Sequence, residues 1–543
     1  MAVLTEEQIT EWLNDPLAIR GTLIEANCLV DGIETTRYLS TFSYTTSPSD
    51  IPSNTTYDNI VVGGVKYTEK LVYNTGGGSL SVGDIELGNF NGELNSWLND
   101  IWTNRSIKAY IGDVRWPRDS FILIFDGIIA GIDSRSRTAI NIKIRDKLQR
   151  LNTPIFELKY ADIAPYPDSS NVTPYTDPTD PNNTVADVFL PVTFGEVHNI
   201  TPVLIDTGNL VYMLHYGKTK GIVEVRDNGK PLETNSYTFD PEKGTIKMLF
   251  QPSGTLTCSV QGDKYIETWD SFAPGVTYRQ TVASIIRRLV TAYGKTIPDP
   301  ITGSPTANPS LDRFNDSIDI DQANFSSFDE NNPQPIGLFS VSRENLLSTC
   351  QDLANSIGAQ IYMSRLGKLT ITKISSPPIG EPRIIDSGSM YADSMQISDR
   401  TTVVGSIKLG FTKNWTPQPN LLTNIPYDHK QLFAEQYSTV IRADSETINN
   451  YSFTTYPNQE NTYQITQPGA YAEADRRLNL YKVPHLVYSF TGFSDLLDLK
   501  LGDTVQLINE KYSLTGATGV GIGTVVSLQP DWSTCKVQVG VFI

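Results

Sequence analysis

The chain has 543 residues, of which 39% are apolar and 19% charged, and its formal charge is −17. This length allows about three or four domains with cores of their own, and the composition excludes disorder and coiled coil. The acidic balance argues against stable DNA or RNA binding, because no basic surface is left to neutralise phosphates. The 39 glycines, 32 prolines and 26 tyrosines are typical of turn-rich β-structure.

The start of the chain predicts a short helix that packs against its own domain or a neighbour. Thr5 and Gln8 have capping-box spacing, and Asp15 and Pro16 end the pattern. The apolar face consists of Ile9, Trp12 and Leu13. The first residues do not have the pattern of a signal peptide, and no run of about 20 apolar residues could form a membrane helix. We therefore expect a soluble chain.

From position 18 to about 144, β-like runs dominate, at 22–30, 64–73 and 121–129. One helix is predicted over residues 92–104, because Leu94, Trp97, Leu98, Ile101 and Trp102 recur at helical spacing. The two tryptophans either line a binding groove or anchor the helix on a sheet, and the second interpretation is favoured.

The middle of the chain alternates between loops, strands and helices. Residues 160–183 form a linker or long loop rich in Pro and Asp, and a small β domain follows with a hairpin at Asn228–Gly229. A helix is predicted over 281–293, ended by Gly294, and a polar loop then continues to about Pro335. Ser342 is expected to cap a third helix that Gly358 ends, before a hairpin with strands 360–363 and 368–374.

The last part predicts a helix near 470–481 and strands at 504–509, 523–528 and 536–542. We therefore expect a mainly β protein with a few short helices (β-rich α+β), built from several β-barrel or sandwich domains. The predicted division is an N-terminal β domain with one amphipathic helix (1–154), a Pro/Asp-rich linker (155–190), a small β domain (191–270), a helix-plus-hairpin domain (271–394) and a C-terminal barrel-like β domain (395–543).

No residue is assigned to catalysis, to a cofactor or to a metal. Gly217-Lys218-Thr219 and Gly294-Lys295-Thr296 lack the earlier glycine that a phosphate-binding loop needs. The four histidines have no metal-ligand spacing and are expected to be ordinary core or surface residues: His198, His215, His429 and His485. The four cysteines are far apart and are expected to be buried free thiols: Cys28, Cys258, Cys350 and Cys535.

An acidic run between positions 312 and 330 has the oxygen ligands that calcium prefers, but it lacks the spacing of a calcium loop. A solvated loop is the favoured interpretation of Asp312, Asp316, Asp319, Asp321, Asp329 and Glu330. A pair of carboxylates that cleaves glycosidic bonds leaves no sequence pattern, so a hidden hydrolase stays open as a minor alternative.

Several stretches resemble one known family. Residues 342–362 with Arg365–Ile371 resemble the helix, glycine and hairpin of bacteriophage tail-hub proteins. Residues 470–481, Leu499–Leu507 and 523–532 resemble the closing β domain of such hubs, and Phe194–Asp206 with Val225–Gly229 is similar to a segment of siphophage tail-tip proteins.

The resemblance implies a non-enzymatic virion protein at the distal end of the phage tail, assembled in the host cytoplasm as a ring, most often a trimer. The ring would close the tail tube and frame the DNA exit channel. Its partners would be copies of itself, the tube-end protein, fibre or tip proteins and the tape measure protein. An acidic channel wall suits DNA that must slide without binding. The scattered cysteines give no support to the iron–sulfur cluster of some tail-tip proteins, and no fused lysozyme or peptidase module is evident.

The resemblance places the ring-forming surfaces in the N-terminal β domain and around Leu501-Gly502-Asp503, although Asp503 is better explained as part of its own turn. Two alternatives stay open. A carbohydrate-recognising attachment protein would use some of the 26 tyrosines and seven tryptophans, and a tail-associated cell-wall hydrolase would use some of the many carboxylates.

Overall fold

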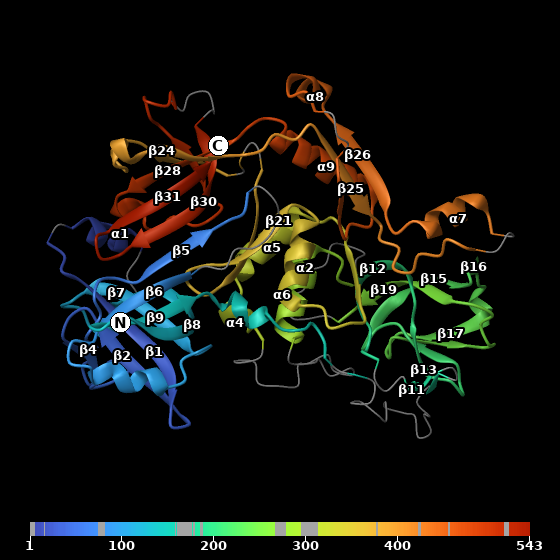
Figure 1. The fold of residues 1–543 in the computed structure, drawn as a ribbon, viewed down its shortest axis with the longest axis horizontal. Coiled ribbons are helices and arrows are strands. Elements are labelled where there is room, and N and C mark those ends of the chain that lie inside the picture. Colours follow the sequence, from blue (N-terminus) through green and yellow to red (C-terminus); the bar gives the residue numbers. More distant parts are fainter. Residues whose placement is uncertain are drawn as a thin grey trace. The chain divides into compact units, whose positions relative to one another are not determined.

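The computed structural model describes residues 6–543 except positions 16, 74–81, 158, 160–175, 178–179, 185–187, 266–277, 295–312, 376–377, 379, 422–424, 454–456 and 515–520. It is mainly β, with several sheets and short helices (Figure 1), which confirms the predicted fold class. None of the described helices is long and apolar enough to span a membrane.

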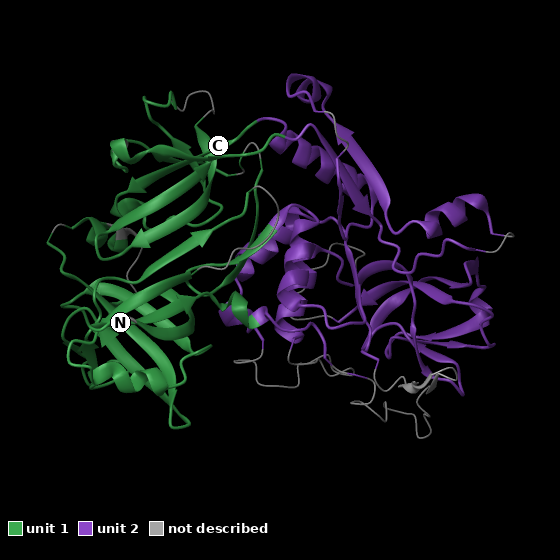
Figure 2. Cartoon of the chain, viewed as in Figure 1, with its two compact units in different colours: residues 1–150, 360–403, 484–543 green, residues 151–359, 404–483 purple. Residues whose placement is uncertain are grey.

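The chain divides into two compact units that each combine separated stretches of sequence (Figure 2). Unit 1 contains Met1–Arg150, Gln360–Val403 and Pro484–Ile543, and unit 2 contains Leu151–Ala359 and Val404–Val483. The five-part division expected from the sequence follows chain order, and it stays a prediction.

Unit 1 is organised around one sheet of fifteen strands in the order β24-β28-β31-β30-β5-β6-β9-β8-β7-β1-β2-β4-β3, with β29 joining β30 to β23. Among the described strands this order has two open ends, so the sheet is not a closed barrel. The strands are β1 (Arg20–Val30), β2 (Ile33–Ser40), β3 (Tyr44–Thr45), β4 (Thr56–Asn59), β5 (Lys66–Lys70), β6 (Val82–Gly88), β7 (Ser106–Asp113), β8 (Ile122–Ser136), β9 (Ala139–Arg145), β23 (Arg383–Ile385), β24 (Gln396–Arg400), β28 (Leu486–Gly492), β29 (Thr504–Leu507), β30 (Ile522–Asp531) and β31 (Lys536–Phe542).

Alternating burial shows how the sequence directs these strands. On β7, Ile107, Ala109 and Ile111 are buried and the residues between them are exposed or half-buried, as a strand with one covered face requires. The predicted N-terminal helix is confirmed as α1 (Glu6–Asn14), with Trp12 and Leu13 buried. The predicted cap at Thr5 and the stop at Pro16 lie outside the described residues.

The predicted helix over residues 92–104 is wrong in its length. A short 3-10 helix, η1 (Glu93–Asn99), ends early because the backbone of Ile101 exchanges hydrogen bonds of 2.9 and 3.0 Å with Leu29. Trp97 and Trp102 are 8% and 2% exposed and their ring centroids lie 5.7 Å apart. The tryptophans therefore anchor this segment in the core, as the favoured interpretation expected.

Unit 2 begins with a β-sandwich. The order β16-β15-β19-β12-β20 forms one sheet and β13-β14-β18-β17 forms the other, and both contribute side chains such as Val260 and Ile246 to one core. The strands are β12 (Val192–Ile200), β13 (Val203–Asp206), β14 (Val211–Met213), β15 (Thr219–Asp227), β16 (Lys230–Pro231), β17 (Tyr237–Asp240), β18 (Thr245–Met248), β19 (Leu256–Asp263) and β20 (Gly337–Ser340).

The predicted hairpin at Asn228–Gly229 is confirmed. Both residues have positive φ angles, 49° and 80°, and they join β15 to β16. Most of the predicted linker over 160–183 lies outside the described residues, and its last part forms a backbone hairpin of β10 (Thr176–Asp177) and β11 (Asp180–Thr184).

Among the described residues of unit 2, the α-helices are α2 (Val282–Ala292), α4 (Asp316–Asp319), α5 (Gln322–Asn331), α6 (Leu346–Asn355), α7 (Tyr427–Ala434), α8 (Ser445–Asn450) and α9 (Gln467–Tyr481). The second predicted helix is α2, which Gly294 follows at a φ of 103°, and the last is α9. The expected polar loop before Pro335 is wrong for residues 316–331, which form α4 and α5. Asn315 and Asp321 cap these two helices, a signal that was present in the sequence.

The helix-and-hairpin segment forms as predicted, apart from its cap. Asn345, rather than Ser342, caps α6 by accepting a hydrogen bond from the backbone of Ser348 at 3.0 Å. Gly358, with a φ of 70°, follows the helix, and Gly367, also at 70°, lies in the turn between β21 (Ala359–Met363) and β22 (Leu369–Lys373). These two strands form a separate sheet.

A three-stranded sheet completes unit 2, in the order β26-β25-β27, with β25 (Ser406–Phe411) between β26 (Ser438–Ala443) and β27 (Gln459–Asn461). Helix α9 covers one face of it, where Leu409 and Val440 pack against Ala470 and Ala474.

The buried face of α2 provides a test of this fold. Leu289 is fully buried, so Leu289→Ala is expected to lower the free energy of unfolding by about 2–5 kcal/mol, through lost contacts and the cavity that remains. Urea denaturation followed by circular dichroism measures this change. Leu432→Ala on α7 is the matched control, because Leu432 is 53% exposed and its loss should shift the midpoint little. Equal shifts for the two variants would contradict the packing described for α2.

Candidate functional site

The histidines lie where ordinary structural residues lie. His215 is buried and its Nδ1 accepts a hydrogen bond of 2.9 Å from the backbone of Thr193. Burial lowers the pKa of His215 to about 4. His198 lies 3.5 Å from a carboxylate oxygen of Glu196, and His485 stacks on the ring of Phe542. Across the described residues, no three His, Cys, Asp or Glu side chains are grouped so that they could hold a metal ion.

The cysteines agree with the expectation of free thiols. Cys28, Cys258 and Cys350 are buried, Cys535 is partly buried, and all four are free. Burial raises the pKa of Cys258 and Cys350, which keeps these thiols protonated and unreactive.

The acidic run has structural partners. Asp316 binds the guanidinium of Arg287 with contacts of 2.5 and 2.7 Å, and Asp319 accepts from the backbone of Asn315 at 2.9 Å. Asp321 caps α5. The interpretation as a solvated loop is therefore corrected for these three residues and for Asp329 and Glu330, which lie in α5, while Asp312 lies outside the described residues.

The two Gly-Lys-Thr segments also have structural roles. Lys218 pairs with Glu242 at 3.0 Å, and Thr219 begins β15. Gly294 follows the end of α2, and the rest of the second segment lies outside the described residues.

Asp503 serves its own turn, as the favoured interpretation expected. Its Oδ2 accepts a hydrogen bond of 2.8 Å from the backbone of Lys500, and Gly502 has a φ of 89°. Leu501 is only 5% exposed, so it packs inside the domain. A ring contact here would have to use residues other than Leu501.

A buried charge cluster in unit 2 was not expected from the sequence. Asp263, at the end of β19, lies 2.8 Å from Arg279 and 3.4 Å from Arg288, and all three side chains are 1% exposed or less. Burial alone would raise the pKa of Asp263, but Arg288, Arg279 and His215 together hold it below its usual value. The three residues come from separate elements, so no spacing in the sequence could have revealed them.

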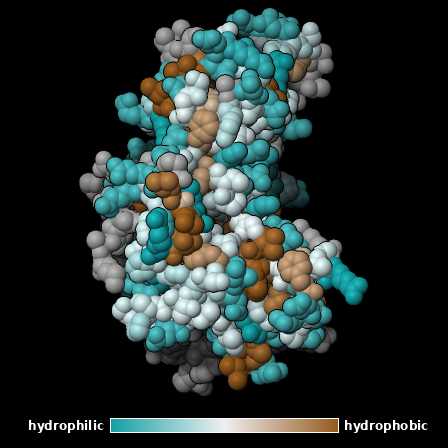
Figure 3. Space-filling view, turned by 90° about the vertical axis from the view of Figure 1, so that its left-hand side faces the viewer, coloured by the Kyte–Doolittle hydropathy of each residue, from teal (hydrophilic) through white to brown (hydrophobic). Residues whose placement is uncertain are grey.

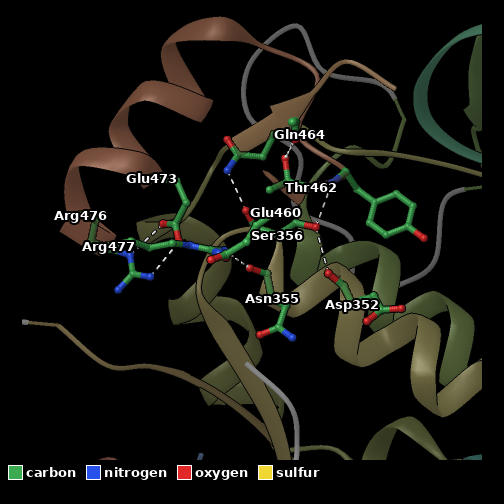
Figure 4. Close-up of polar contacts among 11 residues, drawn as sticks. Asp352, Asn355, Ser356, Glu460, Thr462, Gln464, Glu473, Arg476 and Arg477 are labelled. Carbon is green, nitrogen blue, oxygen red and sulfur yellow. Dashed lines mark hydrogen bonds and ion pairs between the residues drawn. The ribbon is translucent and has the colours of Figure 1, made fainter. Parts of the chain in front are cut away.

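The second polar cluster joins α6 to α9 and is shown in Figure 4. Glu473, 4% exposed on α9, accepts from Arg476 at 2.7 and 2.8 Å and from Arg477 at 2.7 Å. Arg477 also binds Glu460 on β27 and the backbone carbonyl of Asn355 on α6. One buried carboxylate thus holds two arginines, and one of these, Arg477, reaches two other elements.

The end of α6 is fixed from a second direction. The hydroxyl of Ser356 accepts from the backbone of Tyr463 at 2.9 Å and donates to the carbonyl of Asp352 at 2.9 Å. The amide of Gln464 donates to the carbonyl of Ser356 at 2.7 Å. Gly358 follows closely, and a Cβ atom there would lie 1.8 Å from the Nη2 atom of Arg476. We call the set of Ser356, Gly358, Gln464, Glu473, Arg476 and Arg477 the α6–α9 junction.

A sequence signal for this junction existed. Glu473 precedes Arg476 and Arg477 by three and four residues, a spacing that places the charges together on one helix face. The sequence could therefore have predicted the ion pairs within α9, whereas the contact with α6 depends on the tertiary fold. The cluster holds elements in place and offers no nucleophile beside a general base, so its chemistry is that of a structural joint.

The described tryptophans offer little exposed surface for sugar stacking. Trp12, Trp97, Trp102 and Trp532 are buried, and Trp116 and Trp415 are half-buried. Trp415 has the ammonium group of Lys413 3.5 Å from its ring centroid. These aromatic side chains therefore contribute mainly to packing.

No protein-family model matches the sequence, and no curated protein is significantly similar to it. Among solved structures, the chain is similar to the 43 kDa tail protein of prophage MuSo2 from Shewanella oneidensis, with 11% identity, a TM-score of 0.37, and 96% of this chain and 98% of that one covered. A tail protein from Neisseria meningitidis MC58 is 9% identical with a TM-score of 0.34, and the match covers 96% of this chain and 97% of that one. A chain of the virion of a native gene transfer agent particle is 10% identical with a TM-score of 0.39, and the match covers 73% of this chain and 90% of that one. Likenesses this distant do not identify a family.

The junction gives a second test. Glu473→Gln removes a buried negative charge and leaves two arginines facing a neutral amide, which should destabilise the protein by about 3–5 kcal/mol. Glu460→Gln is the matched control, because Glu460 also binds Arg477 but is exposed, so its loss should cost about 1 kcal/mol or less. Denaturant midpoints of the two variants measure the difference. Similar midpoints would show that Glu473 does not hold the junction together.

Proposed function

We propose that this chain is a non-enzymatic structural protein of a bacteriophage tail, and more specifically the hub at the distal end of the tail. In this role a ring of copies, most often three, closes the tail tube, joins the tube-end ring to fibre or tip proteins and frames the DNA exit channel. The single observation that carries the proposal is the helix, glycine and hairpin segment that resembles tail hubs. It folds as that resemblance implies, with α6, the left-handed Gly358 and then β21–β22.

The surface of the N-terminal β region supports assembly through interfaces. The four most exposed large apolar side chains there are Leu17 at 79%, Ile33 at 70%, Ile51 at 82% and Phe90 at 78%. Exposed apolar side chains that gather in patches favour contacts with other proteins. Figure 3 shows hydrophobic side chains in separate patches on the face that it presents.

Open sheet edges add to this support. All five residues of β24, at one end of the unit 1 sheet, are exposed. An edge strand presents backbone groups that another chain can pair with, unless something covers it. The proposal that partners bind through interfaces, rather than in a cleft, accords with these edges.

The assembly part of the proposal is tested on the purified protein by negative-stain imaging at several concentrations, classified for rotational symmetry. The expected result is a three-fold ring with a central opening. Proteomics of purified virions from a phage or induced prophage that encodes the chain tests the location, and the protein is expected among the tail components. Its absence from purified virions would contradict the proposal.

A substitution in the N-terminal β region tests the interface itself. Phe90→Ser is expected to lower the fraction of ring particles at a given concentration while the melting temperature changes little, because the side chain is mostly exposed. Leu249→Ser, at a 59% exposed leucine in unit 2, is the control and should leave assembly unchanged. Rings that form equally well with Phe90→Ser would remove this residue from the interface.

A further inference from the structure

The sequence contains two Asn-Gly steps, Asn91–Gly92 in unit 1 and Asn228–Gly229 in unit 2. An asparagine that precedes glycine loses its side-chain amide readily, because glycine has no side chain to shield the backbone nitrogen that attacks it. In a folded protein the reaction also requires the turn to open, and the free energy of local opening differs widely between segments. The surroundings of the two steps therefore decide which of them reacts.

The reaction consumes only water. The backbone nitrogen of the glycine forms a bond to Cγ of the asparagine, the bond between Cγ and Nδ2 breaks, and ammonia leaves with the proton of the glycine N–H. Water then opens the cyclic succinimide and yields either aspartate or isoaspartate, in which the main chain runs through the side-chain carbon. A neutral amide is thus replaced by a carboxylate.

The turn at Asn228–Gly229 is held on several sides. The backbone N–H of Asn228 donates to the carbonyl of Thr255 at 2.9 Å, and the carbonyl of the buried Gly229 accepts from Nη1 of Arg226 at 2.7 Å. A Cβ atom on Gly254 would lie 2.7 Å from Cβ of Asn228, so the two loops are in direct contact. Asn228 therefore has little room to rotate its Cγ onto the nitrogen of Gly229.

The turn at Asn91–Gly92 is held mainly at its ends. Asn89 is buried, and its Oδ1 accepts from the backbone of Leu94 at 3.0 Å. Between these two residues Asn91 is exposed, and its side chain has no hydrogen bond to any residue that the structure describes. The N–H of Gly92 donates to the carbonyl of Asn89 at 3.3 Å, which is longer than the usual N–H···O distance. A Cβ atom on Gly92 would contact only the side chain of Asn95.

We propose that Asn91 is a site of spontaneous deamidation in the folded protein, and that packing protects Asn228 from the same reaction. At Asn91 one long hydrogen bond has to break before Cγ reaches the nitrogen of Gly92. At Asn228 the hairpin between β15 and β16 has to separate from the loop that carries Gly254. The modification does not rest on the proposed tail function.

The product changes the surface beside Phe90, which precedes Asn91 and is 78% exposed. Aspartate or isoaspartate adds a negative charge there, and isoaspartate also lengthens the main chain within the turn. Copies of an acidic chain repel one another more when this charge is added. Assembly through Phe90 is therefore expected to weaken as the protein ages, a consequence that does rest on the proposed function.

Peptide mapping by mass spectrometry, after incubation of the full chain at pH 8.5 and 37 °C, tests the modification. Digestion at acidic pH stops the reaction during preparation. In the folded protein, Asn91 is expected to convert at least about ten times faster than Asn228. In guanidinium chloride both turns are open, so the two sites should react at similar rates. Asn91→Gln closes the ring far more slowly and should lose the mass change at this position.

Equal rates at Asn91 and Asn228 in the folded protein would overturn the proposal, and so would a ratio no larger than that in guanidinium chloride. Isoaspartate at position 91, detected by enzymatic methylation, supports the succinimide route, whereas aspartate alone contradicts it.

The consequence for assembly is tested by comparing aged wild type with aged Asn91→Gln in negative-stain images. A loss of rings confined to the wild type supports the consequence, and an equal loss in both removes it. A fresh wild type that forms no rings contradicts the ring proposal, while the masses at Asn91 still decide the modification.

Discussion

The pairing of β5 with β30 holds unit 1 together. It places Leu528 opposite Glu69 and Asp531 opposite Lys66, so residues from opposite ends of the chain become neighbours in one sheet. Without it, the strands that follow residue 485 and those that precede residue 146 would be separate sheets with open edges. The entropy of closing so long a loop grows only slowly with its length, and burial along β30 offsets it.

Both units contain buried carboxylates that are paired with compensating cations. Asp263 in unit 2 faces two arginines, and Glu473 holds two more at the α6–α9 junction. In unit 1, Asp126 has Lys147. An isolated charge in a protein interior is too costly to keep, so these clusters tie together elements that have few other reasons to meet. Such clusters specify geometry more than they add stability.

Local patterns predicted the parts of the fold that local physics determines. Helix α2 follows from its apolar spacing and its terminal glycine, and the Asn228–Gly229 turn follows from the positive φ angles that these residues accept. The same helical spacing misled the prediction over 92–104, because the bridge between Leu29 and Ile101 is a tertiary contact that the periodicity does not contain. The candidate sites divide in the same way: the ion pairs of Glu473 have a helical spacing, whereas the partners of Asp263 come from other elements.

The β5–β30 pairing also has a consequence for how the protein is made. Strand β5 emerges from the ribosome early, and β30 follows only after most of the chain has been translated, an interval on the order of tens of seconds at typical elongation rates. During that time one edge of β5 has no partner strand, and an unpaired edge invites association between nascent chains. Lys66 and Lys70 occupy the exposed positions of β5. Until β30 pairs with it, the strand therefore carries positive charges that repel β5 of another nascent chain.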